Sequence, residues 1–207
     1  MKKQGVLTVI SGFSGAGKGT IVKELIKKHD TYSLSISATT RKPREGEVHG
    51  REYFFKTVEE FEEMIQAGEF IEWAKFVDNY YGTPRAYVEE QMAAGRDVIL
   101  EIEIQGAMHV KEMFPDALML FVTPPSAEEL KNRLVGRGTE TEEVIANRLR
   151  RAVEESPFMN DYDYIMVNDD LESCVEEVHQ TISSYHFTKS QSGEIIEKMQ
   201  QDLKQFL

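Results

Sequence analysis

The 207-residue sequence lacks several features that mark proteins of membranes or oxidising compartments. It has a single cysteine, Cys174, so no disulfide can form within the chain. No long apolar run resembles a signal peptide or a transmembrane helix. The five histidines are scattered, without the spacing of a metal site. We therefore expect a cytoplasmic protein that does not bind membranes.

Positive charge is also scarce. The chain has 24 lysines and arginines against 36 aspartates and glutamates, which gives a formal net charge of −12. This balance argues against a general nucleic-acid-binding or membrane-surface-binding protein. An acidic protein that binds a phosphorylated small molecule must gather its cations locally, so the positions of the arginines are informative.

The most informative segment follows an apolar stretch at residues 6–10 and precedes a helical pattern. Residues 11–20 read SGFSGAGKGT. A glycine-rich turn between a strand and a helix is typical of a phosphate-binding loop, in which backbone N–H groups and the helix N-terminus face phosphate oxygens. We expect nucleoside triphosphate binding, with Lys18 at the outer phosphates. The expected contacts in this loop are Gly12, Phe13, Ser14, Gly15, Ala16, Gly17, Lys18, Gly19 and Thr20.

The candidate protein ligands of a magnesium ion are Thr20 in this segment and Glu101 outside it. Phosphate-binding loops usually place a serine or threonine directly after the lysine, where its hydroxyl helps to hold Mg²⁺. Here Gly19 takes that place and Thr20 follows, so Thr20 either coordinates the metal or contacts only the α-phosphate. Glu101 ends an apolar run, where a carboxylate of a phosphate-loop protein can reach the metal or its waters. Strand alternation places Glu101 and Glu103 on the same face, so one of the two would serve Mg²⁺ or its waters and the other a ribose or base, with a solvated strand end as the alternative.

Apolar runs alternate with helical patterns along most of the chain. This alternation predicts βαβ units around a parallel sheet, an α/β fold. The predicted core strands are 6–10, 33–37, 98–102, 118–122 and 164–167, and the predicted helices are about 18–29, 104–113, 126–135, 140–156 and 170–187. Two of the helices begin with capping-box signatures, Ser126 with Glu129 and Thr139 with Glu142.

Three segments depart from this alternation. Residues 38–95 predict short strands at 52–55 and 70–77, a helix at 58–67 and a turn at 81–84, an insertion large enough to bind a second substrate. Residues 136–139 place Arg137 between glycines, which indicates a mobile lid. The tail 193–207 predicts an amphipathic helix. We expect its apolar face to dock on the body of the protein, and self-association of two subunits is the alternative. The apolar face comprises Ile196, Met199, Leu203 and Phe206.

Two groups of arginines have positions suited to phosphate. Arg41 and Arg44 lie in a segment that Pro43 and Gly46 keep from being helical. Because guanidinium groups bind phosphate bidentately, these two arginines are candidates to hold a second, phosphorylated substrate, with a solvated loop as the alternative.

The second group comprises Arg133, Arg137 and Arg148. At 100° per residue, Arg148 borders an apolar stripe of its predicted helix, whereas Arg150 points to solvent. Arginines of a lid can neutralise charge on a phosphoryl group during transfer.

Together these residues resemble the guanylate kinase family, whose members move a phosphoryl group from ATP to GMP. The resemblance covers residues 5–187 and includes the phosphate loop, residues 37–47, Tyr53, Glu72, residues 81–83, 101–103, 136–142 and 167–170. It implies a phosphate-loop (P-loop) three-layer fold with a central parallel sheet, a mixed α/β GMP-binding insertion and a small lid. The chain would then be one domain, with a core at 1–37, 96–133 and 155–190, the insertion at about 38–95, the lid at about 134–154 and a C-terminal helix at about 191–207.

The resemblance also implies the substrates MgATP and GMP, with dGMP as a further acceptor, and direct in-line transfer. The implied catalytic residues are Lys18, Arg41, Arg137 and Arg148. Besides the phosphate loop, Arg133 and Asn168 belong to the ATP site. The implied GMP site comprises Ser37, Arg41, Arg44, Glu47, Tyr53, Glu72, Tyr81, Thr83, Glu101 and Glu103.

Guanine chemistry agrees with Glu72 at the base. Guanine presents N1–H and N2–H₂ as adjacent donors to one carboxylate, whereas adenine has an acceptor at N1 and no 2-amino group. The chain departs from common family forms at Phe13, at Gly19, at Thr83 and at the pair Glu101 and Glu103, where Pro, Ser, Ser and Asp are frequent. Two other functions remain open: an inactive guanylate-kinase-like module that binds phosphopeptides, and a P-loop kinase of another phosphorylated metabolite.

Overall fold

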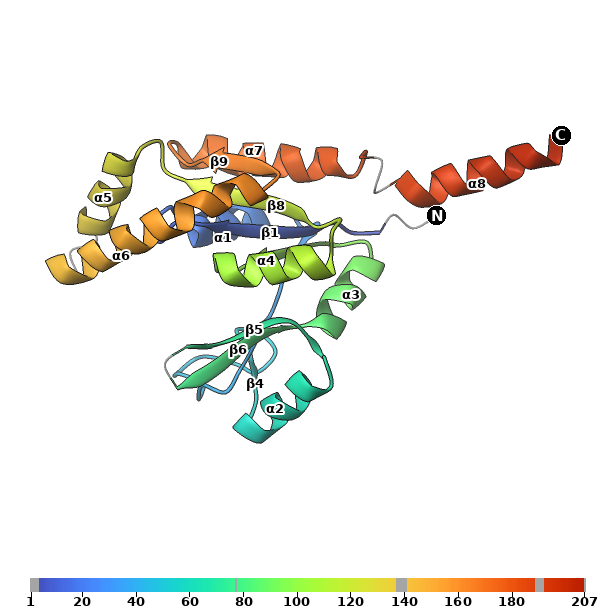
Figure 1. Ribbon diagram of the computed structural model, residues 1–207. Coiled ribbons are helices and arrows are strands. Elements are labelled where there is room, and N and C mark those ends of the chain that lie inside the picture. Colours follow the sequence, from blue (N-terminus) through green and yellow to red (C-terminus); the bar gives the residue numbers. More distant parts are fainter. Residues whose placement is uncertain (1–3, 77, 137–140, 189–191, 207) are drawn as a thin grey trace.

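The computed structural model describes residues 4–76, 78–136, 141–188 and 192–206. Its larger sheet has five parallel strands in the order β2-β7-β1-β8-β9 (Figure 1). Their bounds are Tyr32–Leu34 for β2, Asp97–Glu101 for β7, Leu7–Gly12 for β1, Leu118–Thr123 for β8 and Tyr164–Val167 for β9. All five predicted core strands are thus present. The α/β fold with a central parallel sheet is confirmed.

Helices cover both faces of this sheet. On one face α1 (Lys18–Lys28) contacts α7 (Leu171–Tyr185), and on the other α4 (Ile104–Met113) lies toward the smaller sheet (Figure 1). The remaining core helices are α5 (Ala127–Gly136), α6 (Glu142–Glu155) and the 3₁₀ helix η1 (Ser156–Asp161). Every residue of β1 is buried, because a central parallel strand is covered on both faces. This burial fixes the base of the phosphate loop.

The smaller sheet has the order β4-β3-β6-β5 and lies beyond α4 (Figure 1). Its strands are β3 (Ala38–Thr39), β4 (Phe54–Phe55), β5 (Phe70–Phe76) and β6 (Asn79–Pro84), and α2 (Val58–Gln66) packs on it. Phe61 of α2 stacks on Phe70 with ring centroids 4.3 Å apart. Thr57 caps α2 through a capping box with Glu60. This sheet therefore has a small aromatic core of its own.

Two features of this region differ from the sequence prediction. The turn predicted at 81–84 is wrong, because these residues form most of β6, paired antiparallel with β5. Gly82 suits a strand here, since a Cβ at that position would lie 2.9 Å from side-chain atoms of Phe70 and Trp73. A helix that was not predicted, α3 (Arg85–Ala93), follows β6. Its Val88 belongs to the main core.

The helix starts differ in detail from the two predicted capping boxes. The N–H of Glu129 donates to Ser126 Oγ over 3.0 Å, while the Glu129 carboxylate binds Arg133. Thr139 lies outside the described residues, and α6 begins at Glu142 with Thr141 as its N-cap. The N-terminal turn of α6 is therefore capped by the threonine directly before it.

The C-terminal segment forms α8 (Gly193–Leu203) and the 3₁₀ helix η3 (Lys204–Phe206), so the predicted helix is confirmed. The expectation that its apolar face docks on the body is wrong. Met199 and Leu203 are each 56% exposed and Phe206 is 85% exposed, and Figure 1 shows α8 pointing away from the sheet. Spacing fixes which side chains share a face and leaves open what covers them. In the described ranges, no helix combines the length and apolarity that a bilayer span needs.

Candidate active site

The phosphate loop joins β1 to α1 and depends on glycine at two positions. Gly17, the N-cap of α1, has φ 96°, and a Cβ there would lie 2.4 Å from Asn168 Nδ2. Gly12 has φ 147°, and a Cβ there would lie 2.1 Å from the carbonyl oxygen of Val122. No side chain fits at either place without moving a neighbour. The loop therefore follows a path that leaves its N–H groups and the start of α1 available to an anion.

Lys18 folds back over this loop. Its Nζ donates to the carbonyl oxygens of Gly12 over 2.7 Å and Phe13 over 3.2 Å. Burial lowers the pKa of Lys18, and the nearby Glu103 and Glu101 charges oppose that shift. The ammonium is thus held at the loop by two carbonyls, with the charges of Glu101 and Glu103 nearby.

Asn168 braces the loop from the end of β9. It is 7% exposed, and its Nδ2 donates to the carbonyl oxygen of Ala16 over 2.8 Å. Its own backbone N–H donates to the carbonyl of Thr123 at the end of β8. The predicted ATP-site asparagine therefore touches the phosphate loop directly.

The two acidic residues at the end of β7, Glu101 and Glu103, have different partners. A Cβ at Gly19 would lie 3.3 Å from Glu101 Oε1, so the Glu101 carboxylate lies beside the start of α1. Burial raises the pKa of Glu101, and the Lys18 ammonium opposes that shift. Glu103 is the N-cap residue of α4, and its Oε2 accepts from Arg151 Nη2 over 2.9 Å. The pair predicted to share one face thus splits between the loop and α6.

Of the predicted lid arginines, Arg133 lies on α5 and Arg148 on α6. Arg148 Nη1 donates to Ser14 Oγ of the phosphate loop over 3.4 Å, whereas Arg150 binds Asn147 one turn back on its own exposed face. Arg133 Nε lies 2.7 Å from Glu129 Oε1, within α5. Arg137 lies outside the described residues. Of the three arginines in this group, the structure places Arg148 against the loop.

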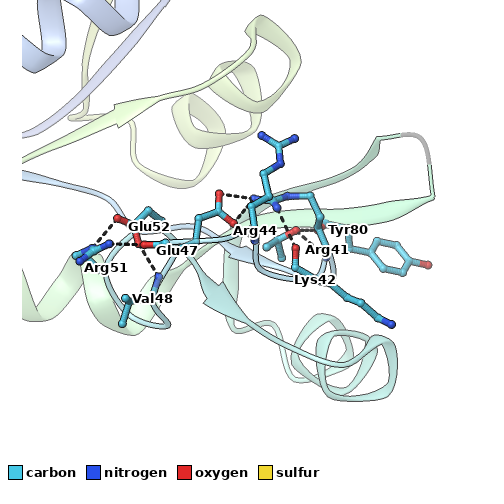
Figure 2. Close-up of polar contacts among 10 residues, drawn as sticks. Arg41, Lys42, Arg44, Glu47, Val48, Arg51, Glu52 and Tyr80 are labelled. Carbon is cyan, nitrogen blue, oxygen red and sulfur yellow. Dashed lines mark hydrogen bonds and ion pairs between the residues drawn. The ribbon is translucent and has the colours of Figure 1, made fainter.

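The arginine pair next to the smaller sheet, Arg41 and Arg44, is organised by one carboxylate, that of Glu47. Arg41 Nη2 donates to both oxygens of Glu47 over 2.8 and 2.9 Å, and the Arg44 backbone N–H donates to Glu47 Oε2 over 2.7 Å (Figure 2). The hydrogen bond from Arg41 lowers the pKa of Glu47 and raises that of Arg41. The Arg41 guanidinium also lies 5.4 Å from the ring centroid of Tyr53. Glu47 therefore holds Arg41 and the backbone of Arg44 in one arrangement.

Two tyrosines line the same region. The rings of Tyr53 and Tyr81 have centroids 6.2 Å apart at an angle of 70°. Tyr81 pairs with Thr39 across β6 and β3, which places it next to the segment that carries Arg41. The residues predicted to bind the phosphate of GMP therefore lie near one another, although they come from three separate stretches of chain.

Glu72 and Thr83 face each other across β5 and β6. Thr83 Oγ1 donates to Glu72 Oε1 over 2.7 Å. Burial raises the pKa of Glu72, and the Thr83 hydrogen bond and the charge of His109 oppose that shift. Glu72 Oε2 lies 3.1 Å from where a Cβ of Gly106 would be, so the carboxylate is directed at α4. Ser37 directly precedes β3, and its carbonyl accepts from the N–H of Phe54.

Several neighbours of these residues were missed by the sequence prediction. Gly106 of α4 lies beside the Glu72 carboxylate, and the charge of His109, one turn further along α4, acts on it. Arg151 and Glu155, four apart on α6, pair with each other and bring Glu103 into contact. Of these contacts, only the one between Arg151 and Glu155 has a signal in the sequence, because an Arg and a Glu four residues apart on a helix are neighbours. The other contacts cross between distant segments.

Known proteins are similar to this chain over nearly its whole length. The family model for guanylate kinase matches residues 4–185. A guanylate kinase of Clostridioides difficile (strain 630) is 54% identical over 202 residues, which are 97% of this chain and 98% of that protein. One of Bacillus anthracis is 52% identical with the same coverage. The crystal structure of guanylate kinase from Anaplasma phagocytophilum aligns with a TM-score of 0.69 at 32% identity, covering 91% of this chain and 89% of that one. The chain belongs to the guanylate kinase family.

Proposed function

We propose that the protein performs the guanylate kinase reaction, reversible transfer of the γ-phosphoryl group of ATP to GMP, at a site with two halves. The donor half is the phosphate loop with Lys18. The acceptor half comprises the Glu47-organised arginines and the Glu72–Thr83 pair. The proposal depends mainly on the hydrogen bond from Thr83 to Glu72. A buried carboxylate held in place by a threonine suits the adjacent N1–H and N2–H₂ donors of guanine.

On the donor side, the loop amides and Lys18 hold the β- and γ-phosphates of ATP. Asn168 keeps the loop in shape through Ala16, and Arg133 and Asn168 lie on the side assigned to the adenine. Arg148 and Arg137 offset charge on the phosphoryl group during transfer. No covalent intermediate on the protein is needed, because positioning and electrostatics supply most of the catalysis in this class of reaction.

Magnesium accompanies ATP in this proposal. The donor set fits a hard cation, because Mg²⁺ prefers oxygen ligands and is usually held by one or two carboxylates plus phosphates. Glu101 lies next to Gly19, in the space that a serine side chain would enter, so its carboxylate and the Thr20 hydroxyl are the residues that would hold the ion or its waters. The metal would neutralise charge between the β- and γ-phosphates.

On the acceptor side, Arg41, Arg44, Tyr53 and Tyr81 hold the phosphate of GMP, while Ser37, Glu72 and Thr83 bind its base. Glu101 and Glu103 are assigned to the acceptor side of the junction between the two halves, toward the ribose. Arg41 then lies where the acceptor phosphate meets the transferred group, and it shares the charge of the transition state with Lys18.

The division of the chain follows the same proposal. We assign residues 38–95 to the GMP-binding insertion and 134–154 to a lid whose movement excludes water. Helix α3, inside the first range, packs on the core and gives the insertion a fixed base. We also assign the protein to the cytoplasm, in keeping with its one buried, unpaired cysteine. Self-association through the exposed face of α8 is the remaining proposal about partners.

The test of the function is a coupled assay of ADP formation with MgATP and, in turn, GMP, dGMP, AMP and UMP. We expect GMP and dGMP to be phosphorylated and AMP and UMP to be poor acceptors. A preference for AMP over GMP would overturn the assignment of Glu72 to guanine. An inactive protein that binds a phosphopeptide would instead favour the binding-module alternative.

Replacing Glu47 with glutamine tests how the GMP phosphate site is organised. The substitution weakens the paired hydrogen bonds that orient Arg41, so we expect the KM for GMP to rise by about 5- to 20-fold while the KM for ATP stays within about twofold. Glu52→Gln is the matched control, because Glu52 likewise binds an arginine and a backbone N–H in the same loop, at Arg51 and Val48. An E47Q protein with a lower KM for GMP would show that Glu47 competes with the phosphate.

A further inference from the structure

Arg151 joins two parts of the molecule that are distant in sequence. Its Nε lies 2.6 Å from Glu155 Oε1, four residues on along α6. Its Nη2 lies 2.9 Å from Glu103 Oε2, at the start of α4. The Glu155 side chain is 13% exposed and the Glu103 side chain 69% exposed. One guanidinium thus connects an acid on the surface to a largely buried acid at the end of α6.

The position of Arg151 on α6 gives this contact a consequence for the phosphate loop. Arg148 lies three residues earlier on the same side of the helix, and it contacts Ser14 of the loop. Ile145, Leu149 and Ala152 of the same helix pack against the main core. Apolar contacts of this kind determine which face of the helix is turned to the core, but they fix its position along its axis only weakly because they are not directional.

Two directional contacts constrain the position of α6 along its axis. Arg148 reaches the loop after β1, and Arg151 reaches the segment after the neighbouring strand β7. These are adjacent carboxyl ends of parallel strands, where the phosphates are expected. A planar guanidinium with two carboxylate partners holds one geometry, which a lysine ammonium would not.

We propose that Arg151 is a positioning residue: through Glu103 and Glu155 it sets the register of α6 so that Arg148 faces the phosphate loop. The proposal rests on the role of Arg148 in the proposed function. In this proposal Glu103, besides its assignment near the ribose, also holds Arg151 of α6 in place. Because exposed ion pairs contribute little to folding free energy, Arg151 is expected to affect the placement of Arg148 more than the stability of the fold.

The test is a set of single variants measured with GMP and MgATP. We expect Arg151→Ala to lower kcat about three- to fivefold, the range of a partly exposed ion pair, with both KM values within about twofold. Glu155→Gln should give a smaller fall in the same parameter. Arg150→Ala is the matched control: it removes the same charge from the adjacent position, where the side chain binds only its own helix's Asn147 in the contacts described, and it should retain wild-type kcat.

The decisive measurement combines substitutions. If Arg151 acts through Arg148, adding Arg151→Ala to Arg148→Ala should lower kcat no further. Additive losses in the double variant, or a loss confined to the KM for GMP, would overturn the proposal. If Arg148→Ala is impaired while Arg151→Ala equals Arg150→Ala, this inference alone fails. If Arg148→Ala keeps wild-type kcat, the proposed role of Arg148 fails with it. Thermal unfolding of each variant checks that it is folded.

Discussion

Replacing Glu72 with glutamine is expected to lower kcat/KM for GMP by about 10²- to 10³-fold while leaving the KM for ATP within about twofold. The carboxylate accepts two hydrogen bonds from guanine in the proposed complex. Glutamine keeps one acceptor, which can still receive the Thr83 hydroxyl, but it turns an N–H₂ group toward guanine donors. E72Q therefore loses one hydrogen bond to guanine, and its amide N–H₂ faces a guanine N–H donor at a buried position.

The selectivity of the enzyme should change together with its rate. AMP lacks the 2-amino group and has an acceptor at N1, which an amide can meet as a donor. We therefore expect the ratio of kcat/KM for GMP to that for AMP to fall in E72Q, mainly through the loss with GMP. Glu69→Gln is the matched control, because it makes the same chemical change on an exposed residue just before β5. An E72Q enzyme with wild-type use of GMP would favour a kinase of another metabolite or another base contact.

The pH dependence offers an independent check on Glu72. Burial raises its pKa above the usual value for glutamate, so its protonated form persists to higher pH than that of an exposed carboxyl group. A protonated Glu72 cannot accept from both guanine donors. kcat/KM for GMP should therefore fall as the pH drops through this raised pKa. E72Q should lack that acidic limb, which initial rates across a pH series would show.

The phosphate loop was predictable because its signal is local. A strand, a glycine-rich turn and a helix lie within about twenty residues, and the positions of Gly12 and Gly17 follow from backbone geometry alone. The parallel core strands were predictable for a related reason, since strands buried on both faces form continuous apolar runs.

Residues 81–93 show where such local signals fail. The glycine and proline of the sequence Tyr81-Gly82-Thr83-Pro84 indicate a turn, yet Gly82 serves a strand whose neighbours come too close for a side chain. Helix α3 has Val88 as its only buried residue, so it lacks a clear apolar stripe. At Gly82 packing against distant residues outweighs the local turn signal, whereas α3 has a helix-favouring composition and was missed because its apolar pattern is weak.

The contacts of Glu101 and Glu103, at the end of β7, could not be predicted from the sequence for a different reason. Alternation predicts one face for Glu101 and Glu103 only while the strand continues, and β7 ends at Glu101. Glu103 then begins a helix, and its carboxylate meets Arg151, 48 residues later. Partner choice across such distances depends on how α6 lies over the sheet, which a single sequence does not specify.

Replacing Lys18 with alanine should abolish most of the activity, with kcat lowered about 10³-fold. The ammonium is already placed by the carbonyls of Gly12 and Phe13, so its charge requires little reorganisation when phosphates bind. Removing it takes away the cation nearest the transferred group. It also removes the cation beside Glu101, so a triphosphate entering the loop would meet added repulsion from that carboxylate.

Two measurements separate these effects. The coupled assay at saturating GMP gives kcat, and titration with a fluorescent ATP analogue gives nucleotide affinity, which we expect to weaken about tenfold from the lost charge contact. Lys23→Ala is the control, since Lys23 lies on the exposed side of the same helix and should keep wild-type values. Lys18→Arg should stay impaired, because a planar fork does not reproduce a compact ammonium lodged between two carbonyls. A Lys18→Ala enzyme within about tenfold of wild-type kcat would show that the loop amides and arginines carry the transfer without this lysine.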